Sequence, residues 1–261
     1  MPMVETSKGE VFYSDHRKAG SPYTPVVYVH GASGSRLDWP GELRNLPAAN
    51  AIAIDLPGHG KSPDPGHDTI EAYAAVVRAL MDAIDLDRGI IAGHSMGGAI
   101  AQMFALEYPE RTAGLVLFGT SARLIVNPKI LDQVMTAQQE VAQTLSGWVF
   151  GPTATDEMRD LMYGKMMALP PLVIYQDYLA CNRFDVRDRL HKITAPTLII
   201  GGEKDKMTRF SLSVDMHQDI PNSTLVKVEN AGHMMTLEKT EFVVEAMRDW
   251  LTTLPRRDEA T

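Results

Sequence analysis

Short apolar runs alternate with segments of helical spacing along most of the chain. The runs are rich in Val, Ile, Leu and Ala, and each ends in a turn signal. They predict strands over residues 26–30, 51–55, 89–93, 114–119, 197–201 and 224–229, with an antiparallel start at 10–15. Most runs are apolar at every position rather than at alternate ones, so we expect them to be buried on both faces. A mostly parallel sheet covered by helices has this pattern, which places the chain in the α/β class.

Helical spacing is clearest between the second and third of these runs. Apolar side chains recur there at intervals of three and four residues, which places them on one face of a helix. They are Ile70, Tyr73, Val77, Leu80 and Ile84. A second helix is predicted over residues 96–108. Strand–helix–strand units of this kind connect neighbouring strands of a parallel sheet.

The alternation stops between about residues 121 and 191. Helices are predicted near 127–145, 154–169 and 171–184, separated by Pro and Gly. Met and aromatic residues are frequent in this segment, and flexible thioethers suit an adaptable apolar pocket as well as a core. We therefore predict a core domain of residues 1–120 and 192–261, with a helical cap of residues 121–191 inserted between two strands. As a lid, this cap is expected to move more than the sheet.

The composition excludes several classes of protein. With 25 Lys and Arg against 33 Asp and Glu, the net charge of −8 disfavours a nucleic-acid binder. No run approaches the ~18 apolar residues of a membrane span, and the first residues lack the apolar stretch of a signal peptide. The single Cys181 cannot form an intramolecular disulfide, and no Cys/His cluster has zinc-ligand spacing. We expect a cytoplasmic protein without a membrane segment or a metal.

Candidate chemistry begins at Gly93-His94-Ser95-Met96-Gly97, a G-x-S-x-G motif where a predicted strand gives way to a helix. In such a turn the serine adopts a strained conformation, and glycines stand where neighbours leave no room for side chains. The motif is short enough to arise by chance. Its weight depends on whether the chain also supplies a base to activate the serine and an acid to orient that base.

Two later residues fit those roles. Asp205 follows the run at 197–201, and His233 follows the run at 224–229. The order Ser, Asp, His is the one expected for this type of turn. Because Ser95, Asp205 and His233 all follow carboxyl ends of predicted parallel strands, they are expected to meet at one edge of the sheet.

Other ionisable residues near strand ends offer alternatives. Asp55 and Glu203 are the competing candidates for the acid, although Asp55 breaks the expected order. His30 and His59 lie in Gly-rich turns and are expected to brace them. His94 adjoins the serine, and we expect it to point away from the serine side chain and to serve packing.

Taken together, these segments resemble the α/β-hydrolase superfamily, in its lid-bearing group of serine esterases. The resemblance is carried by His-Gly-Ala-Ser-Gly-Ser at 30–35, by Asp-Leu-Pro-Gly-His-Gly-Lys-Ser at 55–62 and by the three candidate residues. It implies an α/β-hydrolase fold with a helical cap. By the same resemblance, Ser95 is the nucleophile, His233 the general base and later acid, and Asp205 the orienting carboxylate.

Stabilisation of an oxyanion needs preorganised N–H donors. The backbone N–H of Met96 lies directly after the nucleophile at a helix N-terminus, and the resemblance assigns the second donor to Ala32. The loop departs from the H-G-G-G form of some lipases and favours the H-G-x group of esterases. Whether Trp39, Phe118 and Arg123 line a pocket or only pack is left open by the sequence.

The favoured function is a carboxylesterase that acts on small hydrophobic esters through an acyl-enzyme, without a cofactor. A carbon–carbon hydrolase for meta-cleavage products, or an enol-lactonase, uses the same triad and is the alternative; a non-catalytic receptor on this scaffold is a third reading. Serine at the motif argues against the branches of the superfamily that need a carboxylate nucleophile. The expected partner is a small-molecule substrate, and the oligomeric state is left open.

Overall fold

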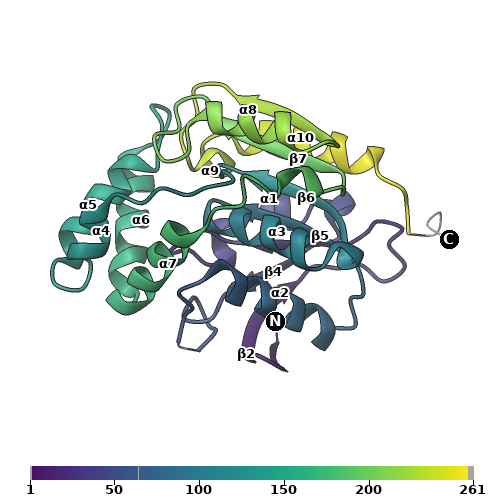
Figure 1. The fold of residues 1–261 in the computed structure, drawn as a ribbon, viewed down its shortest axis with the longest axis horizontal. Helices are drawn as coiled ribbons and strands as arrows, with labels where there is room; N and C mark the ends of the chain where they lie inside the picture. Colours follow the sequence, from purple (N-terminus) through teal and green to yellow (C-terminus); the bar gives the residue numbers. More distant parts are fainter. Residues whose placement is uncertain (1, 64, 258–261) are drawn as a thin grey trace.

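A computed structural model describes residues 2–63 and 65–257, and a mixed sheet forms its centre (Figure 1). The strand order is β1-β2-β4-β3-β5-β6-β7-β8; β1, β2 and β4 pair antiparallel, and the other neighbours are parallel. The strands are β1 (Met3–Thr6), β2 (Gly9–Asp15), β3 (Val26–Val29), β4 (Ile52–Asp55), β5 (Gly89–His94), β6 (Thr112–Phe118), β7 (Thr197–Gly202) and β8 (Ser223–Val228). The predicted α/β class with a mostly parallel sheet is confirmed.

Helices cover both faces of the sheet. Along β3, Val27 and Val29 face a core shared with α2, α3 and α8, whereas Val26 and Tyr28 face a second core shared with α1, α9 and α10. This alternation follows the two-residue period of a strand. The helices are α1 (Gly41–Arg44), α2 (Ile70–Ala83), α3 (Met96–Glu107), α8 (Phe210–Asp219), α9 (Met235–Glu238) and α10 (Thr240–Thr253). Short 3-10 turns occur at Arg36–Asp38, Pro47–Ala49, Pro109–Arg111 and Leu190–Lys192.

Burial of the strands depends on their position in the sheet. Every residue of β3, β4, β5 and β7 is buried, as their uninterrupted apolar sequences predicted. By contrast, β8 is an edge strand with a single neighbour, and most of its residues are partly or fully exposed. None of the helices in the described residues is long and apolar enough to cross a membrane.

Four helices lie between β6 and β7 and gather to the left of the sheet in Figure 1. We refer to residues 121–191 as the helical insertion. Its helices are α4 (Pro128–Gln133), α5 (Gln138–Trp148), α6 (Asp156–Ala168) and α7 (Pro171–Arg183). The description of this segment as a separate cap domain stays a prediction.

The single helix predicted near 127–145 is wrong, because the chain breaks it into α4 and α5. The break falls at Ala137, whose backbone has φ −140° and ψ 49° and is not helical. The turn lets α4 pack against α7 while α5 packs against α6. Ile130 of α4 and Val141 of α5 are both buried in the same core.

Candidate active site

Ser95 occupies a tight turn between β5 and α3. Its backbone has φ 55° and ψ −115°, in the left-handed half of conformational space that strains a residue with a side chain. The turn is held by Ser95 N–H, which donates to the Phe118 carbonyl oxygen at 2.9 Å. A Cβ at Gly97 would overlap the Val29 carbonyl oxygen, and one at Gly93 would overlap the backbone of Gly97. Both glycines of the motif are therefore required by close backbone approach.

Asp205 and His233 meet in the loops that follow β7 and β8. His233 Nδ1 lies 2.8 Å from Asp205 Oδ2, and the Thr208 hydroxyl donates to the same oxygen at 2.9 Å. The other oxygen, Oδ1, accepts from the backbone N–H groups of Met207 at 2.7 Å and Thr208 at 2.9 Å. The carboxylate is thus fixed by its own loop and in turn fixes the orientation of the imidazole.

The protonation of this pair follows from its surroundings. Burial alone would raise the pKa of Asp205, but the charge of His233 and the hydrogen bonds to His233 and Thr208 outweigh it and hold that pKa below its ordinary value. Asp205 is therefore an anion near neutral pH, and the Nδ1 that faces it carries the ring proton. That leaves His233 Nε2 as the nitrogen able to accept a proton.

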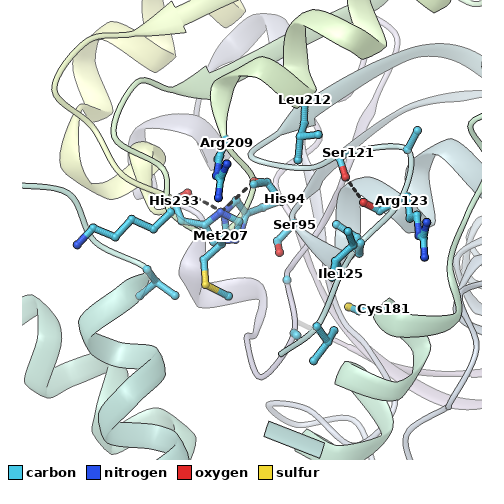
Figure 2. A pocket seen from close by; sticks show the side chains of 18 of the residues that line it. His94, Ser95, Ser121, Arg123, Ile125, Cys181, Met207, Arg209, Leu212 and His233 are labelled. Atoms are coloured by element: carbon cyan, nitrogen blue, oxygen red, sulfur yellow. Dashed lines mark hydrogen bonds between the residues drawn. The ribbon is translucent and has the colours of Figure 1, made fainter. Parts of the chain in front are cut away.

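Ser95 and His233 line one cavity of about 620 Å³. Figure 2 shows Ser95 beside His94 and His233 in this cavity. Within the described residues, the Ser95 hydroxyl makes no hydrogen bond to the His233 ring. Such bonds between nucleophile and base are often long before substrate binds. The three predicted residues thus converge, with Asp205 bonded to His233 and Ser95 on the same cavity.

Two backbone N–H groups near Ser95 have no hydrogen-bond acceptor within the described residues. Neither Ala32 N–H nor Met96 N–H donates to another group within the described residues, and Met96 begins α3, where the helix leaves its N–H groups unpaired. The loop that carries Ala32 is close, because a Cβ at Gly31 would lie 3.3 Å from Ser95 Cβ. The predicted pair of donors therefore flanks the serine on adjoining segments.

The cavity is lined by both apolar and charged side chains. The helical insertion supplies much of the apolar lining, namely Leu145, Val149, Met162, Met166, Tyr178 and Cys181. Charged side chains also line it: Asp38, Arg123, Arg187, Lys206, Arg209, Asp215 and Asp219. Of the open candidates, Arg123 lines the cavity, whereas Trp39 and Phe118 are buried and pack edge to face with ring centroids 5.4 Å apart.

The histidines near the site have defined partners. His94 Nε2 donates to the His233 carbonyl oxygen at 2.9 Å, and the two rings are 4.6 Å apart. His94 thus packs against His233, as predicted, and it also forms part of the wall of the cavity that contains Ser95. His30 Nδ1 donates to the Gly31 carbonyl oxygen at 2.8 Å while its Nε2 accepts from Leu56 N–H at 3.0 Å. His30 thus braces two turns, as predicted.

Burial keeps both of these imidazoles neutral. It is the first cause that lowers the pKa of His30 to about 4 and the pKa of His94 to about 4, and a neighbouring histidine adds to the effect in each case. Neither ring is therefore poised to exchange protons near neutral pH.

The alternative acids are engaged elsewhere. Asp55 is fully buried and pairs with Arg36 at 2.5 Å, while it also accepts from Lys61 N–H at 3.0 Å. It therefore joins the loops that follow β3 and β4. Glu203 accepts from Asn230 N–H at 3.0 Å. Neither carboxylate forms a hydrogen bond with His233 in the described residues, so Asp205 keeps the position next to the ring.

Two residues of the site were not singled out from the sequence. Thr208 donates to Asp205, and its signal is the Asp-x-x-Thr spacing, in which an aspartate bonds backbone N–H groups two and three residues ahead. Gly119 has φ +48°, and a Cβ there would lie 3.3 Å from His233 Nδ1 and 3.4 Å from Asp205 Oδ2. A glycine at the end of an apolar strand was the only local sign of that contact.

The sequence and the overall structure are similar to those of known proteins. The profile of a family described as alpha/beta hydrolase fold matches residues 24–240. The chain is 27% identical to a 2-hydroxy-6-oxononadienedioate/2-hydroxy-6-oxononatrienedioate hydrolase of Pseudomonas sp, over 91% of this chain and 92% of that protein. It is 27% identical to a pimeloyl-[acyl-carrier protein] methyl ester esterase of Neisseria meningitidis, over 87% of this chain and 93% of that protein. Among solved structures, a thermophilic esterase from Thermogutta terrifontis superposes with a TM-score of 0.85 at 26% identity, over 97% of this chain and 98% of that one.

Proposed function

The chain belongs to the α/β hydrolase fold family, and from that premise we propose that it is a serine hydrolase that cleaves carboxylic esters through an acyl-enzyme. The observation that carries the proposal is the buried Asp205–His233 pair, whose imidazole lines the same cavity as the strained Ser95. Chemistry of this type needs a nucleophile, a base and an orienting acid in that arrangement.

In the proposed reaction, Ser95 Oγ attacks the ester carbonyl carbon while His233 Nε2 takes the hydroxyl proton. The carbonyl oxygen becomes an oxyanion that accepts from Ala32 N–H and Met96 N–H. His233 then gives its proton to the leaving alcohol as the carbon–oxygen bond breaks, which leaves the acyl group on Ser95. Water attacks this acyl-enzyme, its proton passes through His233, and Ser95 is restored. Asp205 stays an anion throughout and stabilises the imidazolium that forms twice.

We propose that residues 121–191 act as the cap of this site, over a core of residues 1–120 and 192–261. The support is that α5, α6 and α7 contribute a large share of the apolar cavity lining. Met162 and Met166 offer flexible surfaces that adapt to an acyl group. Substrate specificity would then be set by the insertion rather than by the three reacting residues.

A second candidate is hydrolysis of a carbon–carbon bond in a meta-cleavage product. Two observations favour it: the similarity to a hydrolase named for a dienedioate, and the cationic side chains of Lys206 and Arg209 on the cavity wall. Arg123 and Arg187 also line the cavity, but both pair with Asp185. Salt screens the overall charge of −8 beyond about 8 Å, so the local charge depends on the cations and on Asp38, Asp215 and Asp219, which line the same cavity. An anionic substrate is therefore compatible with this pocket.

We further propose that the protein acts in the cytoplasm on a small-molecule substrate. Its single cysteine, Cys181, is buried and free, as is usual in a reducing compartment. Fractionation of the source cells, with the chain detected by an antibody, tests the location.

The test of the reaction uses purified protein and a panel of p-nitrophenyl esters with graded acyl chains, together with a vinylogous diketone. We expect ester turnover that disappears in Ser95→Ala. Turnover of the diketone alone would replace the first candidate by the second. Turnover of every substrate at the rate of Ser95→Ala would reject both and favour a non-catalytic receptor.

A further inference from the structure

A second buried His–Asp pair lies where the core meets the helical insertion. His59 Nε2 donates to Asp177 Oδ2 of α7 at 2.8 Å, and neither side chain is exposed. The other ring nitrogen, Nδ1, lies 3.0 Å from the Pro57 carbonyl oxygen. Because both partners are acceptors, both ring nitrogens must carry protons, and His59 is an imidazolium.

The charge of His59 is consistent with its surroundings. Burial alone would lower the pKa of His59, but the Asp177 charge and the hydrogen bonds to Asp177 and Pro57 outweigh it and raise that pKa above its ordinary value. The raised pKa extends the pH range over which His59 stays charged beside Asp177, and the proposed ester hydrolysis makes no use of this pair.

The Asp177 carboxylate also reaches the loop beside the reacting serine. Its Oδ2 accepts from Ser33 N–H at 2.7 Å, and its Oδ1 accepts from the Tyr73 hydroxyl at 2.7 Å. Ser33 directly follows Ala32, whose N–H is one of the two proposed oxyanion donors. A side chain of the insertion thus holds the backbone on the oxyanion side of the cavity.

The turn formed by residues 31–34 has a backbone conformation that needs a stabilising contact. Gly34 N–H donates to the Gly31 carbonyl oxygen at 3.1 Å, which closes a turn with Ala32 and Ser33 at its centre. Ser33 has φ 59°, a conformation that this position of a turn normally gives to glycine. A non-glycine residue persists there only where its surroundings fix it, and Asp177 supplies such a contact.

We propose that Asp177 is a positioning residue: it fixes the 31–34 turn so that Ala32 N–H faces the reacting oxygen, and it thereby couples α7 to catalysis. This inference rests on the proposed function, since it assigns a task to one of the proposed oxyanion donors. The coupling has a route to substrate, because Tyr178 and Cys181 lie on the same helix and line the cavity. A substrate group that displaces α7 also displaces the turn that carries Ala32.

The principal test is Asp177→Asn. An amide has one acceptor oxygen and two N–H donors, so it cannot accept from Ser33, His59 and Tyr73 together. We expect kcat on a p-nitrophenyl ester to fall by about ten- to a hundredfold, less than the loss when an oxyanion donor is removed, with little change in KM. Phenylboronic acid, which forms a tetrahedral adduct with a reactive serine, should lose affinity by a similar factor.

Three further variants separate positioning from stability. Tyr73→Phe removes an equally short hydrogen bond to the same carboxylate but leaves Ser33 in place, so it should lower the melting temperature and leave kcat within about twofold. Ser33→Gly combined with Asp177→Asn should recover part of kcat, since glycine adopts the turn without strain. If Asp177→Asn does not fold, His59→Gln with Asp177→Asn leaves no lone buried charge and should show the same loss of kcat.

Hydrogen exchange does not depend on catalysis, so it can test the role of Asp177 separately from the proposed ester hydrolysis. Hydrogen exchange of a peptide spanning residues 30–37 should be faster in Asp177→Asn than in Tyr73→Phe and the parent. Equal exchange in all three, or an Asp177→Asn variant with the kcat of the parent, overturns the positioning role. If the parent hydrolyses no ester but exchange over residues 30–37 is still faster in Asp177→Asn than in the parent, the held turn is supported and only the ester reaction is rejected.

Discussion

The described part of the chain contains two buried His–Asp pairs, and their local geometry is nearly the same. In each, a ring nitrogen lies 2.8 Å from a carboxylate Oδ2. They differ at the other ring nitrogen. His59 Nδ1 is bound to the Pro57 carbonyl oxygen, whereas His233 Nε2 has no hydrogen-bond partner in the described residues and its ring lines the cavity. An imidazole acts as a base only through a nitrogen that is free to take a proton, so the pair contact alone does not identify the reacting histidine.

The partners of the two carboxylates differ as well. Asp205 is held by Met207 and Thr208 of its own loop, while Asp177 is held by Ser33 and Tyr73, which come from distant segments. A locally held carboxylate orients one neighbour and moves with its loop. A carboxylate shared by three segments fixes those segments to one another, which is a structural task with an effect on geometry elsewhere.

Removal of each histidine gives the largest contrast. We expect His233→Ala to reduce kcat by about a millionfold, as loss of the base does in a characterised serine protease. His59→Gln keeps a donor toward Asp177 and should cost less than about tenfold. Steady-state kinetics on one p-nitrophenyl ester measures both. Similar losses in the two variants would mean that the free nitrogen is not what distinguishes the pairs.

The second contrast concerns the acids. Asp205→Asn should reduce kcat by about ten-thousandfold and retain a residual rate, because the amide no longer favours the Nδ1–H tautomer of His233. This loss should exceed the one proposed for Asp177→Asn by about a hundred- to a thousandfold. Activity in Asp205→Asn comparable to the parent would move the acid role elsewhere, with Asp55 the first candidate.

A smaller effect is expected at Gly119, where an added Cβ would meet Met235 Cε at 3.1 Å as well as the Asp205–His233 pair. Gly119→Ala places a methyl group 3.3 Å from His233 Nδ1 at φ +48°, and we expect about a tenfold loss of kcat with about 1–2 kcal/mol of destabilisation. Gly164→Ala in α6 is the matched control, because a Cβ there meets nothing within 4 Å. That control should leave kcat unchanged and raise stability by about 0.5–1 kcal/mol. Equal kcat values in the two variants would show that a methyl group at position 119 does not disturb the function of the Asp205–His233 pair.

Much of the fold was visible in the sequence because it depends on local patterns. Uninterrupted apolar runs predicted the buried strands, and the G-x-S-x-G motif predicted the turn at Ser95. The positions of Asp205 and His233 followed from a rule about strand ends, and the structure brings these two together. Such features need only neighbours in the chain and a parallel sheet.

What sequence reasoning missed depends on contacts between distant segments. His59 was expected to brace its own turn, which it does through Pro57, but nothing near it indicated a partner on α7. Asp177 and Ser33 lie 144 residues apart, and no periodicity links them. The break at Ala137 was missed for the same reason, since it is set by what α4 and α5 pack against rather than by a Pro or Gly. Contacts between the helical insertion and distant segments of the core therefore become visible only in the structure.

The smallest expected effect is a pH dependence of stability that belongs to His59. Its pKa in the folded protein is raised above the ordinary value of 6.5, so the folded state binds the proton more tightly than the unfolded state does. The ion pair with Asp177 therefore stabilises the fold fully below pH 6.5, and this contribution is lost as the pH rises through the folded pKa. The pairs differ here too, because the pKa of Asp205 is lowered and its contribution is lost only in acid.

The window above pH 6.5 isolates His59 from the other buried groups. His30 and His94 have pKa values of about 4, so they destabilise the fold only as the pH falls below 6.5. Burial raises the pKa of Cys181 above its ordinary value of 9.0, so that thiol matters only above pH 9.0. Urea unfolding between pH 6.5 and 8.5 should give a free energy of unfolding that falls with pH in the parent and stays level in His59→Gln. Parallel slopes in the two proteins would mean that His59 is not a charged partner of Asp177, because a neutral ring makes no contribution that is lost as the pH rises through this range.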